Sequence, residues 1–386
     1  MIDNVAKLRI LYIVSSYKVG DGVSSAVYSQ IFENVKHDYI VVSKWLYSSQ
    51  ENLNIIEFDE KKLLNELRHN KYDLIHYLKG INSNILNLVI KVLRKLHQDI
   101  PVLTTVCQNP NFNYLLLSPF ELKHSSHFVF IDKTSYKEPL ISFIPDNCKS
   151  QIYLVGNKNK VLSEGVEYVQ RDDNKIIFGR GSTLSKCPKD MFDIFDKIDF
   201  PAKEFHIVGV PTEGNWVADE AKKRKNVTLY GFLTFNDWVE VCKKFDIFLY
   251  QLPEVCHASI DGTLGLAMWM KKPVIYYGSE APKERFESGS NGFIAQTKDD
   301  IVKYANLLSK NFDLRKKIGE AGRDSIERKF GTLELRQQKY LNAYNRCINS
   351  SVKSFKIPLS YYFIYTRRAW KRIIREVTGI YARPQF

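Results

Sequence analysis

Short apolar, largely β-branched runs alternate with stretches of helical periodicity along this chain, and this alternation most limits the folds it can adopt. Continuous apolar strands between helices are typical of a parallel sheet that helices cover on both faces. The alternation lapses at residues 156–174, a polar stretch with Gly, Asn, Lys and paired Asp, and then starts again. The sequence therefore predicts an α/β protein with two such units in tandem, and 386 residues suit two domains at about 150 residues each.

The expected elements fall into two series on either side of that polar stretch. The first series predicts strands at Leu8–Val14, Tyr39–Val42, Ile55–Phe58, Leu74–His76, Val102–Val106, Phe128–Ile131 and Ile152–Val155. The second predicts strands at Lys175–Phe178, Glu204–Val208, Val227–Leu229, Ile247–Tyr250, Pro273–Tyr276 and Gly292–Ala295. Helices are expected at Ser25–Val35, Glu60–His69, Ile85–His97, Met191–Ile198, Asn236–Lys244, Thr263–Met270, Ile301–Leu308 and Leu314–Lys329.

These series define the domains that we expect. An N-terminal domain covers residues 1–156, a linker 157–174 and a second domain 175–330, and residues 331–350 form a helix that crosses back to the first domain. Ligands of open α/β sheets bind beyond the carboxyl ends of the strands, so two facing units would create an interdomain cleft between them. That cleft is the expected site.

Positive charge is concentrated at the end of the chain. The net charge is +13, and residues 351–386 hold eight basic residues against one acid, interleaved with aromatic residues. Aromatic rings at headgroup level and Lys or Arg facing anionic lipid would hold such a tail on the inner face of a membrane. A helix packed on the first domain is the alternative. Nucleic acid is not expected as a partner, because no RNA-binding motif accompanies the tail.

Other sequence features narrow the class of protein. Six scattered cysteines with no CxxC pair predict free buried thiols and no metal site. The first seven residues lack the order of a signal peptide, and no apolar run approaches the roughly 20 residues that span a bilayer. We therefore expect a cytoplasmic protein, peripheral on the membrane at most.

Three loops carry residues suited to an anionic ligand. The loop Ser15–Ser25 contains Gly20 and Gly22, which allow backbone to approach a phosphate or sugar at a helix start. The second loop follows a strand and brings Arg180 and then Lys186, a fork donor and a point charge that suit a diphosphate. The alternative for the first loop is a tight turn with a serine as helix cap. The alternative for Arg180 and Lys186 is that they are solvated surface charges.

The third loop precedes the helix expected at Thr263–Met270. Asp261, Gly262 and Thr263 would give an N-cap, a close backbone approach and free amides at the helix start, which is a geometry that binds anions. A bare N-cap explains the same residues without any ligand.

The order of these motifs resembles that of the GT-B glycosyltransferases, specifically the group 1 (GT4-like) family. The resemblance covers nearly the whole chain and is most specific in the second half. It rests on Gly179-Arg180…Lys186, Ile207-Val208-Gly209, Val227…Gly231, Phe245-Asp246-Ile247, Pro253, Ala267-Met268…Pro273-Val274 and Glu284…Gly289…Gly292-Phe293, and in the first half on Gly22-Val23, Tyr72–His76 and the strand before Cys107.

This resemblance implies two Rossmann-like domains, the first (1–156) for the acceptor and the second (175–330) for the nucleotide-sugar donor. It also implies sugar transfer from a nucleotide-diphosphate sugar, with retention of configuration at the sugar and without a metal or other cofactor. Fixed cations and helix amides can stabilise the leaving diphosphate in place of a metal. The acceptor implied is a glycan or a lipid-linked sugar in the synthesis of surface polysaccharide or glycoconjugate.

The resemblance also assigns residues. Its implied donor contacts are Gly22, Arg180, Lys186, Glu254, Asp261, Gly262, Thr263 and Glu284, and its catalytic candidates are Asp261 and His76. A satisfied strand-end histidine and a helix-stabilising carboxylate are the alternatives for His76 and Glu284.

Several family positions differ in this chain. The family's paired glutamates would fall near His257 or Ala258 and at Leu266, and its His-Asp pair is replaced by Cys107-Gln108. A non-catalytic GT-B-like partner subunit of a glycosyltransferase complex is therefore the alternative function. Retention of Arg180 and Lys186 favours the enzyme, since a scaffold has no need of diphosphate-binding cations.

Overall fold

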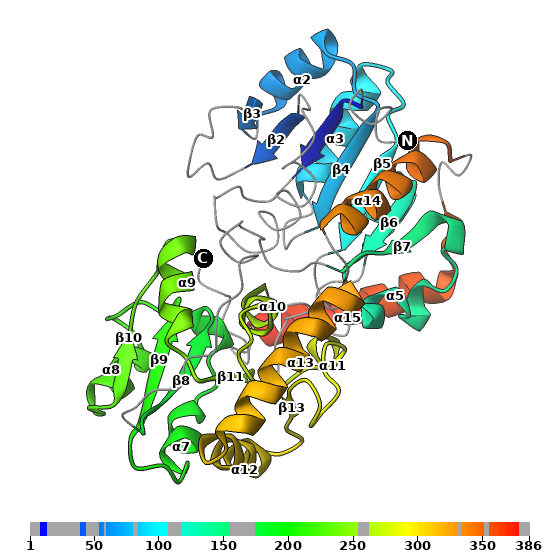
Figure 1. Cartoon of the computed structure of the whole chain (residues 1–386). Coiled ribbons are helices and arrows are strands. Elements are labelled where there is room, and N and C mark those ends of the chain that lie inside the picture. The colour runs from blue at the N-terminus through cyan, green and yellow to red at the C-terminus, as the bar shows by residue number, and fades with distance from the viewer. Residues whose placement is uncertain are drawn as a thin grey trace. The chain divides into compact units, whose positions relative to one another are not determined.

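The computed structural model places the described residues in two compact units (Figure 1). The described residues are 8–13, 39–43, 54–57, 59–79, 84–106, 117–153, 174–253, 262–330, 333–350 and 355–377. Unit 1 contains those up to residue 153 together with 333–377, and unit 2 contains 174–330.

Unit 1 is built on a seven-stranded sheet in the order β3-β2-β1-β4-β5-β6-β7, and all of its strand pairs are parallel. Its strands are β1 (Ile10–Ile13), β2 (Tyr39–Ser43), β3 (Asn54–Glu57), β4 (Leu74–Lys79), β5 (Val102–Val106), β6 (His127–Phe130) and β7 (Lys149–Gln151). Its helices before the linker are α2 (Glu60–His69), α3 (Asn84–Lys95), α4 (Pro119–His124) and α5 (Lys133–Tyr136), with 3-10 turns η1 (Pro139–Ile141) and η2 (Asp146–Cys148).

Capping and burial explain these elements. Asp59 accepts hydrogen bonds from the amides of Lys61 and Lys62, and so begins α2. Helices α2 and α3 bury apolar faces against the sheet, with Leu63, Leu67 and Val89 inaccessible to solvent. Strands β1, β4, β5 and β6 are buried along their whole length, as expected for the centre of a parallel sheet.

Two helices that come after unit 2 in the sequence complete unit 1. Helix α14 (Leu333–Ile348) contacts β4, β5 and β6, and Figure 1 shows it in orange alongside these strands. Its Tyr340, Ala343 and Tyr344 are buried. Helix α15 (Leu359–Val377) follows it. Unit 1 is therefore discontinuous in sequence.

Unit 2 is built on a six-stranded parallel sheet in the order β10-β9-β8-β11-β12-β13. Counted from its own first strand this order is 3-2-1-4-5-6, that of the Rossmann fold. Its strands are β8 (Ile176–Gly181), β9 (Lys203–Val208), β10 (Val227–Leu229), β11 (Ile247–Gln251), β12 (Val274–Tyr277) and β13 (Phe293–Ile294). Its helices are η3 (Leu184–Lys186), α7 (Met191–Asp196), α8 (Trp216–Lys222), α9 (Phe235–Lys243), α10 (Gly262–Trp269), α11 (Glu280–Lys283), α12 (Lys298–Ser309) and α13 (Phe312–Phe330).

The predicted fold class is confirmed: the chain is an α/β protein with two Rossmann-like parallel sheets. Several strand bounds differ from those predicted, and two of the differences change an interpretation. The seventh strand is the polar segment Lys149–Gln151, which pairs through its backbone with β6, whereas Ile152 and Tyr153, the described part of the strand predicted at Ile152–Val155, lie outside any strand. Strand β4 continues three residues past His76 to Lys79, so that histidine lies in mid-strand and not at a strand end. The helix predicted at Ser25–Val35 lies outside the described residues.

The state of the cysteines and the apolarity of the helices test two further predictions. Cys148, Cys187, Cys242 and Cys347 are free and buried, as predicted, and the remaining two cysteines lie outside the described residues. Within the described ranges, no helix is both long and apolar enough to cross a membrane. The cleft between the two units stays a prediction.

Gly179 allows close packing at the centre of the second sheet. A Cβ atom on this residue would lie 1.9 Å from the ring of Phe245, which is itself buried. Arg180 is the next residue of β8. The neighbouring strand, β11, begins at Ile247, two residues after Phe245, so this packing lies beside the part of β8 that carries Arg180.

We expect Gly179→Ala to lower the melting temperature of the protein strongly, because Phe245 must move out of a packed core to admit the methyl group. The loss of stability should be on the order of 1–3 kcal/mol. Gly262→Ala is the matched control, since a Cβ there meets no atom within 4 Å. Equal melting temperatures for the two variants would contradict this account of the packing.

Candidate functional site

The candidate site lies in unit 2, where the strand order reverses. Strand β8 pairs with β9 on one side and with β11 on the other, so the carboxyl ends of β8 and β11 meet at this switch point. Ligands of doubly wound sheets bind outside the strand ends at such a point. Arg180 is the next-to-last residue of β8, and Gln251 is the last of β11.

Arg180 is a buried guanidinium with no acidic partner among the described residues. Its side chain is 1% exposed, and Nη2 donates to Ser182 Oγ at 3.3 Å and to the carbonyl oxygen of Lys186 at 2.5 Å. The guanidinium carbon lies 5.4 Å from the ring centre of Tyr250. The Nε and Nη1 groups have no hydrogen-bond partner in the described part of the chain.

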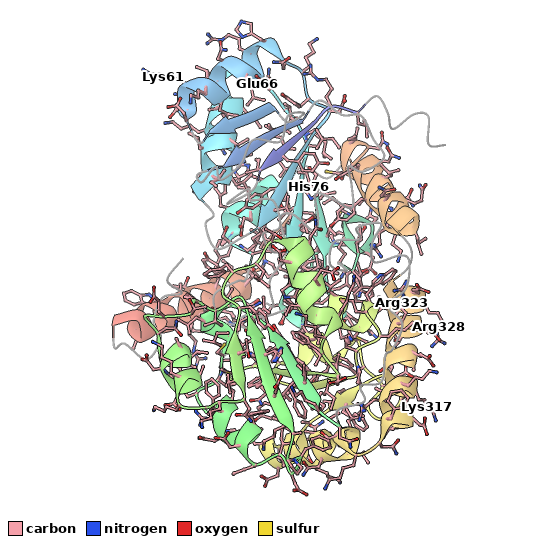
Figure 2. The ribbon with its side chains drawn as sticks, turned by 60° about the vertical axis from the view of Figure 1, so that its left-hand side comes forward. Lys61, Glu66, His76, Lys317, Arg323 and Arg328 are labelled. Atoms are coloured by element: carbon pink, nitrogen blue, oxygen red, sulfur yellow. The ribbon has the colours of Figure 1, made fainter. Side chains whose placement is uncertain are left out.

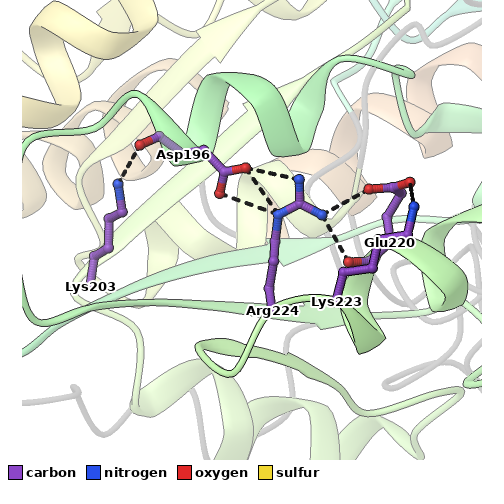
Figure 3. Close-up of polar contacts among 5 residues, drawn as sticks. All are labelled: Asp196, Lys203, Glu220, Lys223 and Arg224. Atoms are coloured by element: carbon purple, nitrogen blue, oxygen red, sulfur yellow. Dashed lines mark hydrogen bonds and ion pairs between the residues drawn. The ribbon is translucent and has the colours of Figure 1, made fainter.

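Arg224 of the same unit shows the contrasting arrangement of a charge-paired arginine. It donates to both carboxylate oxygens of Asp196 and to Glu220, at 2.8 to 3.2 Å (Figure 3). These carboxylates raise the pKa of Arg224 above its ordinary value. A buried cation without such partners carries a desolvation cost that a bound oxyanion would offset. The surroundings of Arg180 therefore suit an anionic ligand.

The neighbouring loop and helix start come together at the same strand end. Lys186 closes η3 and its backbone accepts from Arg180, while its side chain is partly exposed. Thr263 donates its hydroxyl to the carbonyl oxygen of Gly181 at 2.9 Å, which places the first turn of α10 beside the end of β8. Gly262 is exposed at the start of that helix. The amides and dipole of a helix start favour an anion.

Two side chains of this region were missed by the sequence analysis. Gln251 is 1% exposed, its amide oxygen and nitrogen have no partner among the described residues, and it lines a cavity of about 40 Å³ with Asp190 and Lys298. Arg285 is also buried, and its Nη1 would lie 2.5 Å from a Cβ on Gly265 in α10. The signal for Gln251 was a single amide that closes an otherwise apolar strand.

The remaining predicted residues are placed as follows. Glu284 follows α11 and is partly exposed, next to the buried Arg285. Gly22, Glu254 and Asp261 lie outside the described residues. Their roles stay predictions.

His76 lies inside unit 1 (Figure 2) and is completely buried. Its Nδ1 is 2.9 Å from the hydroxyl of Tyr344 in α14, and its Nε2 is 2.7 Å from Thr105 Oγ1 in β5. The Tyr344 hydroxyl also bonds that of Tyr12 at 2.9 Å. Both ring nitrogens are thus occupied within the fold, which favours the satisfied histidine over the catalytic role predicted for it.

Burial lowers the pKa of His76 to about 3, so the imidazole is neutral over the ordinary pH range. No described group of three or more His, Cys, Asp and Glu side chains comes together as a metal site would require.

The fold of the chain is similar to that of several solved structures. No protein-family model matches the sequence, and no curated protein matches it. Among solved structures, Anabaena HepE in complex with UDP-glucose is similar at a TM-score of 0.67 and 14% identity, covering 88% of this chain and 99% of that one. Sucrose-phosphate synthase from Thermosynechococcus elongatus is similar at a TM-score of 0.68 and 13% identity, over 89% and 100% of the two chains.

A glycosyltransferase from Rickettsia africae is similar at a TM-score of 0.65 and 17% identity, over 89% of this chain and 100% of that one. All three likenesses extend across both units. The protein therefore has the GT-B architecture, as the sequence predicted.

The neutral, buried His76 predicts a pH dependence of stability. The unfolded chain binds a proton on this residue near pH 6.5 and the folded chain only near pH 3, so stability present above pH 6.5 is lost as the pH falls. Between about pH 7 and pH 5 the free energy of unfolding should fall by about 2 kcal/mol more in the wild type than in His76→Gln.

Chemical denaturation of both proteins at the two pH values measures this difference. His127, whose pKa burial lowers to about 4, is present in both proteins and cancels. Parallel pH profiles for wild type and variant would show that His76 is not held neutral in the fold.

Proposed function

We propose that the protein is a glycosyltransferase that takes a sugar from a nucleotide-diphosphate sugar and transfers it to a glycan or lipid-linked acceptor. Transfer proceeds with retention of configuration at the sugar and without a metal, as the resemblance to group 1 enzymes implies. The product belongs to a surface polysaccharide or glycoconjugate, made on the cytoplasmic side of a membrane that the tail contacts.

The observation that carries this proposal is the buried Arg180, whose Nε and Nη1 have no partner among the described residues. A diphosphate offers oxygens with the charge and the spacing that a guanidinium fork binds. The neighbouring start of α10 adds helix amides at the same strand end. Solved structures of the same architecture contain UDP or UDP-glucose, which agrees with such a donor.

These groups would act mainly on the leaving group. When the bond from the sugar to the diphosphate breaks, negative charge increases on the diphosphate oxygens. Donors that are already fixed in a site with little water stabilise that charge without reorganising. Arg180 is fixed in this way by Lys186 and Ser182, and Lys186 would add a second positive charge. In this proposal Asp261 and the rest of its loop contact the donor sugar.

Arg180→Met tests the donor site. Replacing an unpaired buried cation by an apolar side chain is neutral or stabilising, so the variant without ligand should keep or raise its melting temperature. It should lose both donor turnover and the rise in melting temperature given by UDP-, GDP-, ADP-, CDP- or TDP-sugars, whichever the wild type binds. At a hundredfold excess over Kd, that binding stabilises the wild type by about 2.7 kcal/mol.

Arg224→Met is the matched control, because it removes an arginine of the same unit that is paired with carboxylates. It should lower the melting temperature of the ligand-free protein, by on the order of 1 kcal/mol of stability, and keep the nucleotide-sugar shift. A shift retained by Arg180→Met would remove Arg180 from the donor site. If no nucleotide sugar shifted the wild type, the non-catalytic partner subunit would be the better hypothesis.

A further inference from the structure

Helix α15 packs on unit 1 through the face that carries Tyr361. Tyr361 is 2% exposed, its ring centre lies 5.4 Å from that of Phe143, and its hydroxyl donates to the carbonyl oxygen of Leu117. Phe355, just before the helix, packs at 5.6 Å from Phe128 of β6. These residues belong to the apolar core of unit 1, so the helix is held in place on that unit.

A second apolar stripe runs along the opposite face of α15. Leu359, Phe363, Trp370 and Ile374 are separated by four, seven and four residues, which places them on one side of a helix. Their side chains are 86%, 70%, 61% and 56% exposed. At 100° per residue, Tyr361 points away from the middle of this stripe. The described side chains of α15 are therefore apolar on two faces, one packed on unit 1 and one exposed.

Exposed large apolar side chains are concentrated on α15. Of the exposed large apolar side chains in the described ranges, Phe232 lies in the loop before α9, Leu307 on α12 and Leu335 on α14. All the others lie on α15, where Tyr362 accompanies the stripe. A contiguous exposed apolar patch on a folded protein marks an interaction surface.

Helix α15 is also rich in positive charge. Between Arg367 and Glu376 its sequence contains five basic residues and a single acid, and Arg367 is exposed close to the stripe. A helix with aromatic and aliphatic residues on one face and cations around the rest of its surface lies in the interface of an anionic bilayer. Its 19 residues span about 28 Å along such a surface.

We propose that α15 docks unit 1 on an anionic membrane, with Leu359, Phe363, Trp370 and Ile374 inserted at the level of the headgroups. Charge complementarity selects this occupant. A second copy of the helix would bring its like charges together. Nucleic acid would use the cations but leave the aliphatic side chains of Leu359 and Ile374 in water.

Docking by α15 extends the membrane contact of the proposed function, and its functional consequence rests on that proposal. It would place the acceptor-binding unit against lipid and so favour a lipid-linked acceptor. Membrane docking itself needs no nucleotide sugar. The two can therefore be tested apart.

The test is cosedimentation of the full chain with vesicles of phosphatidylcholine alone or mixed with phosphatidylglycerol. The wild type should bind the anionic vesicles, bind the neutral ones much more weakly, and be released as salt is raised. The double variant Phe363→Ser, Trp370→Ser should bind anionic vesicles at least about tenfold more weakly than the wild type, because two large apolar side chains no longer insert.

The matched control is Phe232→Ser, Leu307→Ser, which removes two exposed apolar side chains from unit 2 and should bind vesicles as the wild type does. Melting temperatures of both double variants should match the wild type, since all four side chains are exposed.

Four results would overturn the proposal. They are no binding to anionic vesicles, equal binding by the α15 variant, a wild-type dimer that this variant dissociates, and tighter binding of RNA than of anionic vesicles at the same ionic strength. The nucleotide-sugar shift measured on the same α15 variant separates the two proposals: loss of vesicle binding with the shift retained bears on the membrane alone.

Discussion

The close approach of Phe245 to Gly179 is the contact on which the candidate site depends. Because Gly179 has no side chain, the ring of Phe245 fills the space beside β8. Two residues after Phe245 the chain enters β11, which pairs with β8. Arg180 and Gly181 then end β8 at the switch point of the sheet, over Tyr250 and beside the start of α10. Each group of the site is thus positioned by the central packing of unit 2.

A comparison of two arginines explains why Arg180 stands out. Arg224 is surrounded by carboxylates that stabilise its charge, and its role is accounted for by the structure alone (Figure 3). Arg180 is more deeply buried, and in the described part of the chain it is held by a hydroxyl, a carbonyl and an aromatic ring. These neutral partners fix its position without compensating its charge. A site that binds an anion reversibly requires this combination, and a site that only stabilises the fold does not.

The sequence predicted the fold class because apolar β-branched runs and helix caps are local signals; α2 has the predicted bounds, Glu60–His69, with Asp59 as its cap. It also indicated that Arg180 and Lys186 share one strand end. The polar edge strand Lys149–Gln151 could not be predicted, since it is specified by backbone pairing with β6 and not by its own side chains. The environment of His76 was equally inaccessible, because its partner Tyr344 is 268 positions away.

The hydrogen bonds from Tyr344 to His76 and Tyr12 have a consequence for synthesis of the chain. They join α14 to strands β1 and β4, which precede it by more than 250 residues, whereas the sheet of unit 2 and the helices around it are formed within residues 174–330. On the ribosome, domains fold as units when their residues have emerged. Unit 2 can therefore fold before α14 has been translated, and until then the sheet of unit 1 lacks the helix that supplies Tyr344 to His76 and Tyr12.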